Sequence, residues 1–305
     1  MAPPTPLSPG ERIAYASHNE NLEEARARNV RDALAEDIGL CDWTGLLVPA
    51  GRRLRARVIA REAAVLCGRE WFDAVMHALD ASARLDWRVA EGDWTQPDAP
   101  VVFIEAQGRA LLAAERPALN FIQMLSGTAT VTRRHVAAIA GASPLQNQGQ
   151  GCAILDTRKT MPGLRQAQKY AVRVGGGHNQ RLALWHGILI KENHIAAAGG
   201  IGPVLAAARS LDAGVDIQIE VETLAQLEEA LAAGAKSVLL DNFDLARMRE
   251  AVVLTRGRAL LEVSGSVELE QLRDIAATGV DRVSIGRLTK DVKAVDFSMR
   301  VLGPA

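Results

Sequence analysis

The second half of the chain alternates between apolar, strand-like runs and helix-like segments, and this rhythm restricts the possible folds more than any other feature. Strands and helices that alternate every roughly 20–25 residues are typical of βα units around a parallel sheet. We therefore predict an α/β protein. A βα barrel fits better than an open doubly wound sheet, because no GxGxxG sequence follows an early strand. The strand-like runs are residues 153–159, 187–195, 216–222, 237–242, 259–265 and 282–286, and the helix-like segments are 202–214, 223–235, 244–257 and 267–279.

The first half has a different pattern. Residues 21–36 have helical periodicity, and residues 115–140 form a second helix-like stretch in which Gly127 indicates a break. Between these two segments, short β-prone runs are separated by turn signals, which is typical of a small α+β unit. The β-prone runs are residues 54–60, 64–68, 85–89 and 100–106.

Charged and polar residues stand where the apolar strands of the second half end. The carboxyl ends of the strands of a βα barrel meet at one face, and that face carries the chemistry. Polar residues also begin ordinary loops, but their recurrence over six successive strands favours a site. The groups are Arg158–Lys159, Lys191 with Glu192, Asn193 and His194, Glu220 with Glu222, Asp241–Asn242, Ser264–Gly265 and Gly286.

The chemistry of these strand ends suits anionic substrates. Arginine can bind a carboxylate or a phosphate through two hydrogen bonds, and carboxylate oxygens suit Mg²⁺ bound together with substrate phosphates. Small residues ahead of a helix suit a phosphate held by backbone N–H groups. The pattern predicts one phosphorylated, metal-chelating substrate and one acidic substrate. The cations are Arg158, Lys159, Arg181 and Lys191, the carboxylates are Glu220 and Asp241, and the small residues are Ser264, Gly265, Ser266 and Gly286.

Composition excludes several other classes of function. The net charge of −1 and the pI near 6.6 create no general attraction for nucleic acid or for an anionic membrane. Cys41, Cys67 and Cys152 form no CxxC pair, which argues for reduced thiols in a cytoplasmic protein. Residues 1–12 are Pro-rich and lack the apolar centre of a signal peptide, so we expect a flexible tail, and no apolar run is long enough to span a membrane.

Two long strings carry a resemblance to a known family. Residues 156–177 (DTRKTMPGLRQAQKYAVRVGGG) and 189–195 (LIKENHI) resemble the type II phosphoribosyltransferases that act on quinolinate, known as carboxylating nicotinate-nucleotide pyrophosphorylases. The likeness continues through segments such as 114–130, 239–243 and 278–299 and covers nearly the whole chain. The resemblance implies transfer of phosphoribosyl from phosphoribosyl pyrophosphate to quinolinate, with decarboxylation, in NAD biosynthesis. Nicotinate mononucleotide, CO₂ and pyrophosphate would be the products, and Mg²⁺ the cofactor.

The same resemblance implies a fold and an assembly. It indicates an N-terminal α+β sandwich domain at residues 1–118, to which the C-terminal segment 289–305 returns, and an incomplete parallel βα barrel at residues 119–288. It also implies a homodimer, or a higher oligomer, whose active sites are shared between subunits.

The resemblance further implies roles for individual residues. Lys159 would lie between the two substrates, while Glu220 and Asp241 would face the ribose hydroxyls and Mg²⁺. Ser264, Gly265 and Gly286 would hold the 5′-phosphate. The quinolinate carboxylates would be bound by Arg116 of the partner subunit together with Arg158, Arg181, Lys191 and Gln180.

The chain departs from the family pattern at residues 175–186, where GGGHNQRLALWH replaces GGGxNHRxGLxD. Gln180 stands in place of a histidine, Ala183 in place of a glycine and His186 in place of an aspartate. Gln180 can still donate a hydrogen bond to a carboxylate, but it cannot carry charge. If this stretch is extended, His178 shares a face with Gln180 and can partly substitute for the missing imidazole.

Two further departures are milder. Gln218 replaces a frequent glutamate, and Pro117 takes an early position in the second helix, where proline is tolerated.

Three alternative functions remain open. A diverged transferase acting on another aromatic acid is suggested by the changes at Gln180, Ala183 and His186. A Schiff-base aldolase would use Lys159 or Lys191 as the nucleophile, although Lys159 suits anion binding at least as well. The third alternative is a non-catalytic protein that binds phosphoribosyl ligands.

Overall fold

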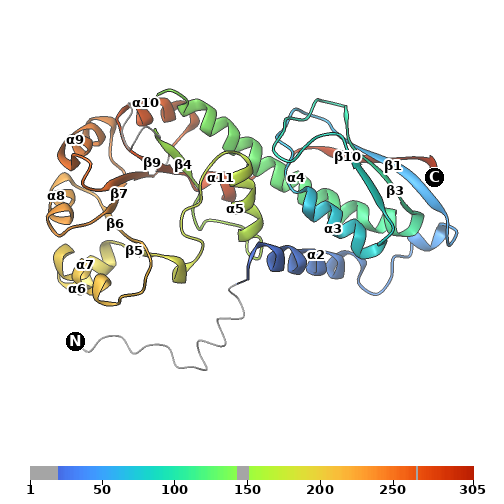
Figure 1. Ribbon diagram of the computed structural model, residues 1–305, viewed down its shortest axis with the longest axis horizontal. Coiled ribbons are helices and arrows are strands. Elements are labelled where there is room, and N and C mark those ends of the chain that lie inside the picture. Colours follow the sequence, from blue (N-terminus) through green and yellow to red (C-terminus); the bar gives the residue numbers. More distant parts are fainter. Residues whose placement is uncertain (1–19, 143–150, 266) are drawn as a thin grey trace.

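The computed structural model describes residues 20–142, 151–265 and 267–305 (Figure 1). The predicted N-terminal tail and Ser266 lie outside the described residues. An antiparallel sheet lies at one end of the molecule and a parallel sheet at the other, and the long helix α4 runs between them (Figure 1). No helix in these ranges has the length and apolar character needed to cross a membrane.

The N-terminal part is built on a four-stranded antiparallel sheet in the order β10-β1-β3-β2. Its core includes Val58, Trp71, Phe72 and Ile104, each with at most 2% of its surface exposed. Strand β10 (Phe297–Pro304) pairs with β1, so the C-terminal segment lies in the N-terminal sheet. The other elements are α2 (Leu22–Ile38), η1 (Gly45–Leu47), β1 (Arg53–Ala60), α3 (Arg69–Leu79), β2 (Arg84–Trp87) and β3 (Pro100–Gln107).

The β-prone run at residues 64–68 is not a strand of this sheet, so that prediction was wrong. The run makes only an isolated bridge between Val65 and Trp94. On one edge the run bonds to residues 92–95, where Leu66 N donates to Asp93 O at 2.9 Å. On the other edge, Val65 N donates to Thr130 Oγ1 at 2.8 Å and Cys67 N donates to Ser126 Oγ at 2.9 Å, so hydroxyls of helix α4 take the place of a second strand partner.

Helix α4 (Gly108–Ile139) is continuous, and the predicted break at Gly127 is wrong. A Cβ atom at Gly127 would lie 2.2 Å from the carbonyl oxygen of Lys293, so the glycine allows the C-terminal segment to cross the helix closely. Because the helix begins at Gly108, Pro117 lies in its interior and not in its first turn. The expected domain boundary at 118/119 falls inside this helix.

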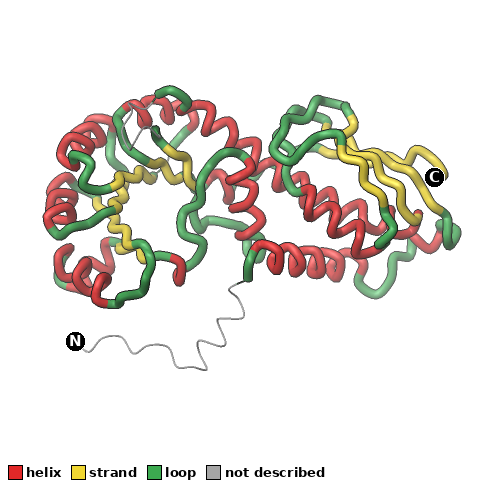
Figure 2. The backbone as a smooth tube through the Cα atoms, in the orientation of Figure 1, coloured by secondary structure: helices red, strands yellow, loops and turns green. Residues whose placement is uncertain are grey.

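The second half forms six parallel strands in the order β4-β9-β8-β7-β6-β5. β4 and β5 are the two edges and do not pair, so the expected α/β fold with an incomplete parallel barrel is confirmed. The strands form an open arc with helices around its outside (Figure 2). The elements are β4 (Ala153–Leu155), α5 (Arg165–Val174), η2 (Leu184–His186), β5 (Ile188–Ile190), α6 (Glu192–Ala198), α7 (Ile201–Ser210), β6 (Ile217–Val221), α8 (Leu224–Ala232), β7 (Ser237–Asp241), α9 (Leu245–Thr255), β8 (Leu260–Ser264), η3 (Leu269–Gln271), α10 (Leu272–Ala277), β9 (Arg282–Ser284) and α11 (Arg287–Lys290).

The predicted strand at residues 187–195 is shorter than expected. The run divides into β5 and α6, and the helix begins directly after Lys191. His194 turns back to this start, where its Nδ1 accepts a hydrogen bond from Lys191 N at 3.0 Å. His194 is therefore part of a helix start and does not line the large cavity described below.

Candidate active site

A cavity of about 570 Å³ opens at the carboxyl ends of the parallel strands. Most of the residues predicted from strand ends line it together, so the convergence expected for a βα barrel is observed. The predicted residues in its wall are Arg158, Lys159, Gln180, Arg181, Lys191, Glu220, Asp241, Ser264, Gly265 and Gly286. Asn242, which was also among the strand-end groups, lines the cavity as well, whereas the sequence did not single out several other lining residues, among them Thr157, Glu262, Arg287 and Lys290.

Arg158 and Arg181 line one side of the cavity, and Arg165 lies in the wall of a neighbouring pocket. Burial, followed by repulsion from Arg158, lowers the pKa of both Arg181 and Arg165 below the ordinary arginine value. The Nε atom of Arg158 is buried and has no hydrogen-bond partner among the described residues. An anion bound in the cavity would relieve the repulsion between the guanidinium groups.

Lys191 and Glu220 form an ion pair across the ends of β5 and β6. The Lys191 Nζ atom lies 2.9 Å from Glu220 Oε2, and their side chains are 46% and 11% exposed, respectively. This pair joins a cation predicted to bind the acceptor acid with a carboxylate predicted to face the ribose. The two predicted subsites are therefore adjacent.

Lys159 lies over the start of α11. A Cβ atom at Gly286 would be 2.9 Å from Lys159 Cδ, so the lysine side chain passes directly over this glycine. The carbonyl oxygen of Lys159 also accepts a hydrogen bond from Thr289 Oγ1 at 2.8 Å. These contacts hold Lys159 at the cavity wall beside the predicted phosphate site.

Asp241 is held in place by neighbouring polar groups. It accepts hydrogen bonds from Ser264 Oγ at 3.0 Å and from Asn242 Nδ2 at 2.9 Å. Gly265 follows with φ +135°, a backbone conformation that residues other than glycine rarely adopt. A carboxylate and a tight glycine turn thus lie next to each other at the ends of β7 and β8.

Glu220 and Asp241 both line the cavity, and their oxygen ligands suit Mg²⁺. Within the described ranges, no group of three or more histidine, cysteine or acidic side chains could hold a metal by itself. Two carboxylates fit a Mg²⁺ ion that is bound mainly through substrate oxygens, since Mg²⁺ typically uses one or two protein carboxylates together with substrate phosphates.

The structure contradicts the expectation that His178 shares a face with Gln180, on which its substitution for the missing imidazole depended. His178 is exposed and does not line the cavity, whereas Gln180 does. The backbone pairs with β4 only at His178, and it then turns because Asn179 Nδ2 and Gln180 N both donate to Asp156. This turn ends the alternation that would have placed both side chains on one face.

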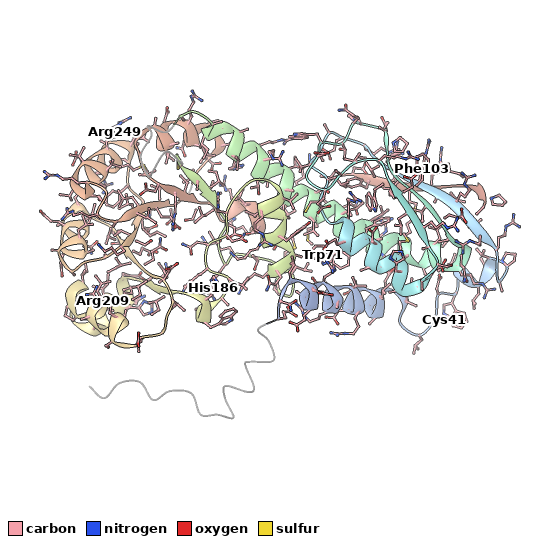
Figure 3. All side chains as sticks on the ribbon, in the orientation of Figure 1. Cys41, Trp71, Phe103, His186, Arg209 and Arg249 are labelled. Carbon is pink, nitrogen blue, oxygen red and sulfur yellow. The ribbon has the colours of Figure 1, made fainter. Side chains whose placement is uncertain are left out.

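Other predicted residues also lie outside the cavity. Arg116 is on an exposed face of α4, and Ala183 is in the wall of a different pocket. His186, labelled in Figure 3, is exposed in η2 ahead of β5, where its Nδ1 accepts a hydrogen bond from Leu182 N at 3.3 Å.

Sequence reasoning missed the buried support of the site. Asp156 and Lys169 form an ion pair with 0% and 1% exposed side-chain surface. Lys169 Nζ also donates to the carbonyl oxygen of Gln180 at 2.8 Å. The only signal was a charged residue on the apolar face of the α5 segment, and such a residue is rarely buried without a partner.

Comparisons with known proteins indicate the same family over most of the chain. Residues 42–126 match the family model described as quinolinate phosphoribosyl transferase, N-terminal domain, and residues 128–300 match that of the C-terminal domain. A relative named nicotinate-nucleotide pyrophosphorylase [carboxylating] from Mycobacterium leprae is 39% identical over 90% of this chain and 97% of its own length. A probable enzyme of the same name from Bacillus subtilis is 38% identical over 87% of this chain and 90% of its own length. The solved nicotinate-nucleotide pyrophosphorylase from Francisella tularensis superposes with a TM-score of 0.86, at 42% identity, over 93% of this chain and 98% of that one.

Proposed function

The chain belongs to the quinolinate phosphoribosyltransferase family, and we propose that it transfers the phosphoribosyl group of phosphoribosyl pyrophosphate to quinolinate. The products are nicotinate mononucleotide, CO₂ and pyrophosphate, and the reaction is a step of NAD biosynthesis. The observation that carries this function is a single cavity that joins Arg158, Lys159 and Arg181 to Glu220 and Asp241. Such a cavity provides cations for two polyanions and carboxylates for a ribose.

The acceptor end binds the two neighbouring carboxylates of quinolinate. Arg158, Arg181 and Lys191 hold them, because all three cations line the same cavity. Burial and then repulsion from Arg158 lower the pKa of Arg181, and a dianion between the guanidinium groups relieves the repulsion. The resemblance adds Arg116 from a second subunit of a homodimer. We propose this contribution because Arg116 is exposed and lies away from its own cavity.

The donor end binds phosphoribosyl pyrophosphate. Ser264, Gly265 and Gly286 hold the 5′-phosphate, while Glu220 and Asp241 face the ribose hydroxyls. These two carboxylates would hold Mg²⁺ together with substrate oxygens, and the ion would neutralise charge on the leaving pyrophosphate. Lys159 lies between the two ends and adds a further positive charge there.

The chemistry then follows from position and charge. The pyridine nitrogen of quinolinate attacks C1′ as the C1′–O bond to pyrophosphate breaks, and the bonding electrons leave with the pyrophosphate. Glu220 and Asp241 stabilise the positive charge that develops on the ribose. The C2–carboxylate bond then breaks, its electron pair passes toward the cationic ring, and a proton takes the place of CO₂. The protein mainly holds two anions together that would otherwise repel each other.

We also propose a cytoplasmic location. The proposal rests on Cys41, Cys67 and Cys152, none of which forms a disulfide within the described residues.

The function is tested by incubating the protein with quinolinate, phosphoribosyl pyrophosphate and Mg²⁺. Nicotinate mononucleotide is detected by its mass, and the released CO₂ is measured in parallel. We expect equal amounts of both products, and a loss of about 100-fold or more in kcat for Lys159→Ala. Lys293→Ala changes an exposed lysine outside the cavity and serves as the control.

Turnover of a different aromatic acid, with none of quinolinate, would support the diverged transferase. Binding of phosphoribosyl pyrophosphate without pyrophosphate release would support a non-catalytic binder.

A further inference from the structure

The side chain of Gln180 is fully engaged by protein groups. Its Nε2 donates to Gln218 Oε1 at 2.9 Å and to the two carboxylate oxygens of Glu262 at 3.0 and 3.1 Å. Its Oε1 accepts from Arg181 N at 2.6 Å. A primary amide has two N–H donors, so neither is left for a substrate carboxylate. The direct contact expected from sequence therefore has no available donor in this arrangement.

Glu262 determines how the side-chain amides of Gln180 and Gln218 are oriented. An ionised carboxylate accepts hydrogen bonds only, so the Nε2 atoms of Gln180 and Gln218 must both face it. Gln218 Nε2 donates to Glu262 Oε2 at 3.0 Å, which turns Gln218 Oε1 toward Gln180. The three side chains therefore hold one another in a single consistent pattern.

Glu262 depends on this pattern because it is buried. Its exposed fraction is 0%, and that of Gln218 is 7%. Within the described residues, no lysine, arginine or histidine nitrogen lies within salt-bridge distance of Glu262. Two neutral amides thus satisfy the carboxylate, and the basic residues of the cavity are left for anionic substrates.

The three residues also separate two cavities: Gln180 and Glu262 line the catalytic cavity, whereas Gln218 does not. A second cavity of about 390 Å³ is bordered by the starts of β7 and β8, at Ser237 and Leu260, and by Gln218. Gln180 and Arg181 line both cavities. The layer of Gln180, Gln218 and Glu262 therefore lies between the catalytic cavity and this lower one.

We propose that Gln180, Gln218 and Glu262 form a positioning unit at the floor of the catalytic cavity, and that Gln180 acts by holding Arg181 and not by contacting the acceptor acid. The role in catalysis rests on the proposed function, whereas the unit itself does not. Loss of any member leaves a buried polar group unsatisfied and releases the backbone at Arg181. The effect falls on the acid that Arg181 binds and spares phosphoribosyl pyrophosphate at the other end of the cavity.

The test compares Gln180→Ala, Gln218→Ala and the double variant, with Gln96→Ala, an exposed glutamine of the N-terminal part, as the control. We expect each single variant to raise the KM for quinolinate about tenfold, and the double variant to raise it little further, because the two residues act as one unit. The KM for phosphoribosyl pyrophosphate should change less than about twofold. Gln96→Ala should match the wild type in both constants.

An unchanged KM for quinolinate in Gln218→Ala would overturn the proposal, because Gln180 would then bind the acid by itself. A double variant whose effect is the product of the two singles would overturn it as well. If Gln218→Ala does not fold, Gln218→Met keeps the length of the side chain and removes its amide. If the wild type turns over no quinolinate, the proposed function fails. The free energies of unfolding of the two single variants and the double variant then still decide whether the two glutamines are coupled.

Discussion

At the scale of single residues, the buried pair of Lys169 and Asp156 supports the site from behind. Burial lowers the pKa of Lys169 and raises that of Asp156, so each charge depends on the other. Asp156 also accepts from Asn179 Nδ2 at 2.7 Å and from Gln180 N at 2.9 Å. The pair therefore fixes the turn that carries Gln180 and Arg181.

We predict that Lys169→Met lowers the free energy of unfolding by about 3–5 kcal/mol, because it leaves the carboxylate of Asp156 buried without a cation. Urea denaturation followed by circular dichroism measures the change. Arg88→Ala breaks an exposed ion pair with Asp86 and should cost less than about 1 kcal/mol. Equal costs for the two variants would show that the buried pair does not have this role.

His135 is expected to make the stability of the protein depend on pH. Burial lowers the pKa of His135 below its ordinary value of 6.5, and its Nδ1 is hydrogen-bonded to Val131 O at 2.7 Å. The native state therefore keeps His135 neutral while the unfolded chain takes up a proton. The stability contributed by neutral His135 is complete above about pH 6.5 and is lost as the pH falls toward the lowered pKa.

His135→Gln keeps a donor for Val131 O but does not titrate. Between about pH 7.5 and about pH 5.5, we expect the variant to lose up to about 1 kcal/mol less unfolding free energy than the wild type. Chemical denaturation at the two pH values measures this difference. An identical loss in both proteins would contradict the assignment.

Among the helices and strands, α4 is a case in which tertiary packing outweighs the helix propensity of a single residue. Glycine inside a helix is unfavourable by itself, yet Gly127 is needed because the backbone at Lys293 crosses it. We predict that Gly127→Ala destabilises the protein by about 1–3 kcal/mol, since the backbone must move. Gly202→Ala is the matched control: this residue lies in α7 with nothing near the position of its Cβ, so the change should be neutral or stabilising by up to about 1 kcal/mol. Thermal and urea unfolding measure both, and a stabilising Gly127→Ala would refute the close crossing.

At the scale of the whole molecule, the proposed homodimer makes a prediction about Arg116. Arg116→Ala and Arg158→Ala should each abolish most activity, because we propose that both arginines bind the acceptor acid. If Arg116 enters the site of a partner subunit, mixing the two inactive variants creates dimers with one intact site. Random exchange in an equal mixture should restore about a quarter of the wild-type activity. Activity after refolding the mixed variants measures this, and a mixture as inactive as its components would place Arg116 in its own subunit's site or outside the reaction.

Much of the architecture could be predicted from the sequence. Strand and helix patterns with different periods indicated the parallel sheet. The rule that strand ends meet at one face predicted that Arg158, Lys191, Glu220 and Asp241 lie together. These properties depend on the local pattern, which a single sequence displays directly.

Only the tertiary structure decided how the site is supported. Gln180 contacts Gln218 and Glu262 across 38 and 82 positions of sequence, and no periodicity links residues that far apart. His178 lies outside the cavity because the buried Asp156 turns the chain after it, and Gly127 lies in a helix because a distant segment crosses there. Local pattern determined which elements form and which of their ends meet, whereas hydrogen bonds and close contacts between distant segments decided which side chains face the cavity.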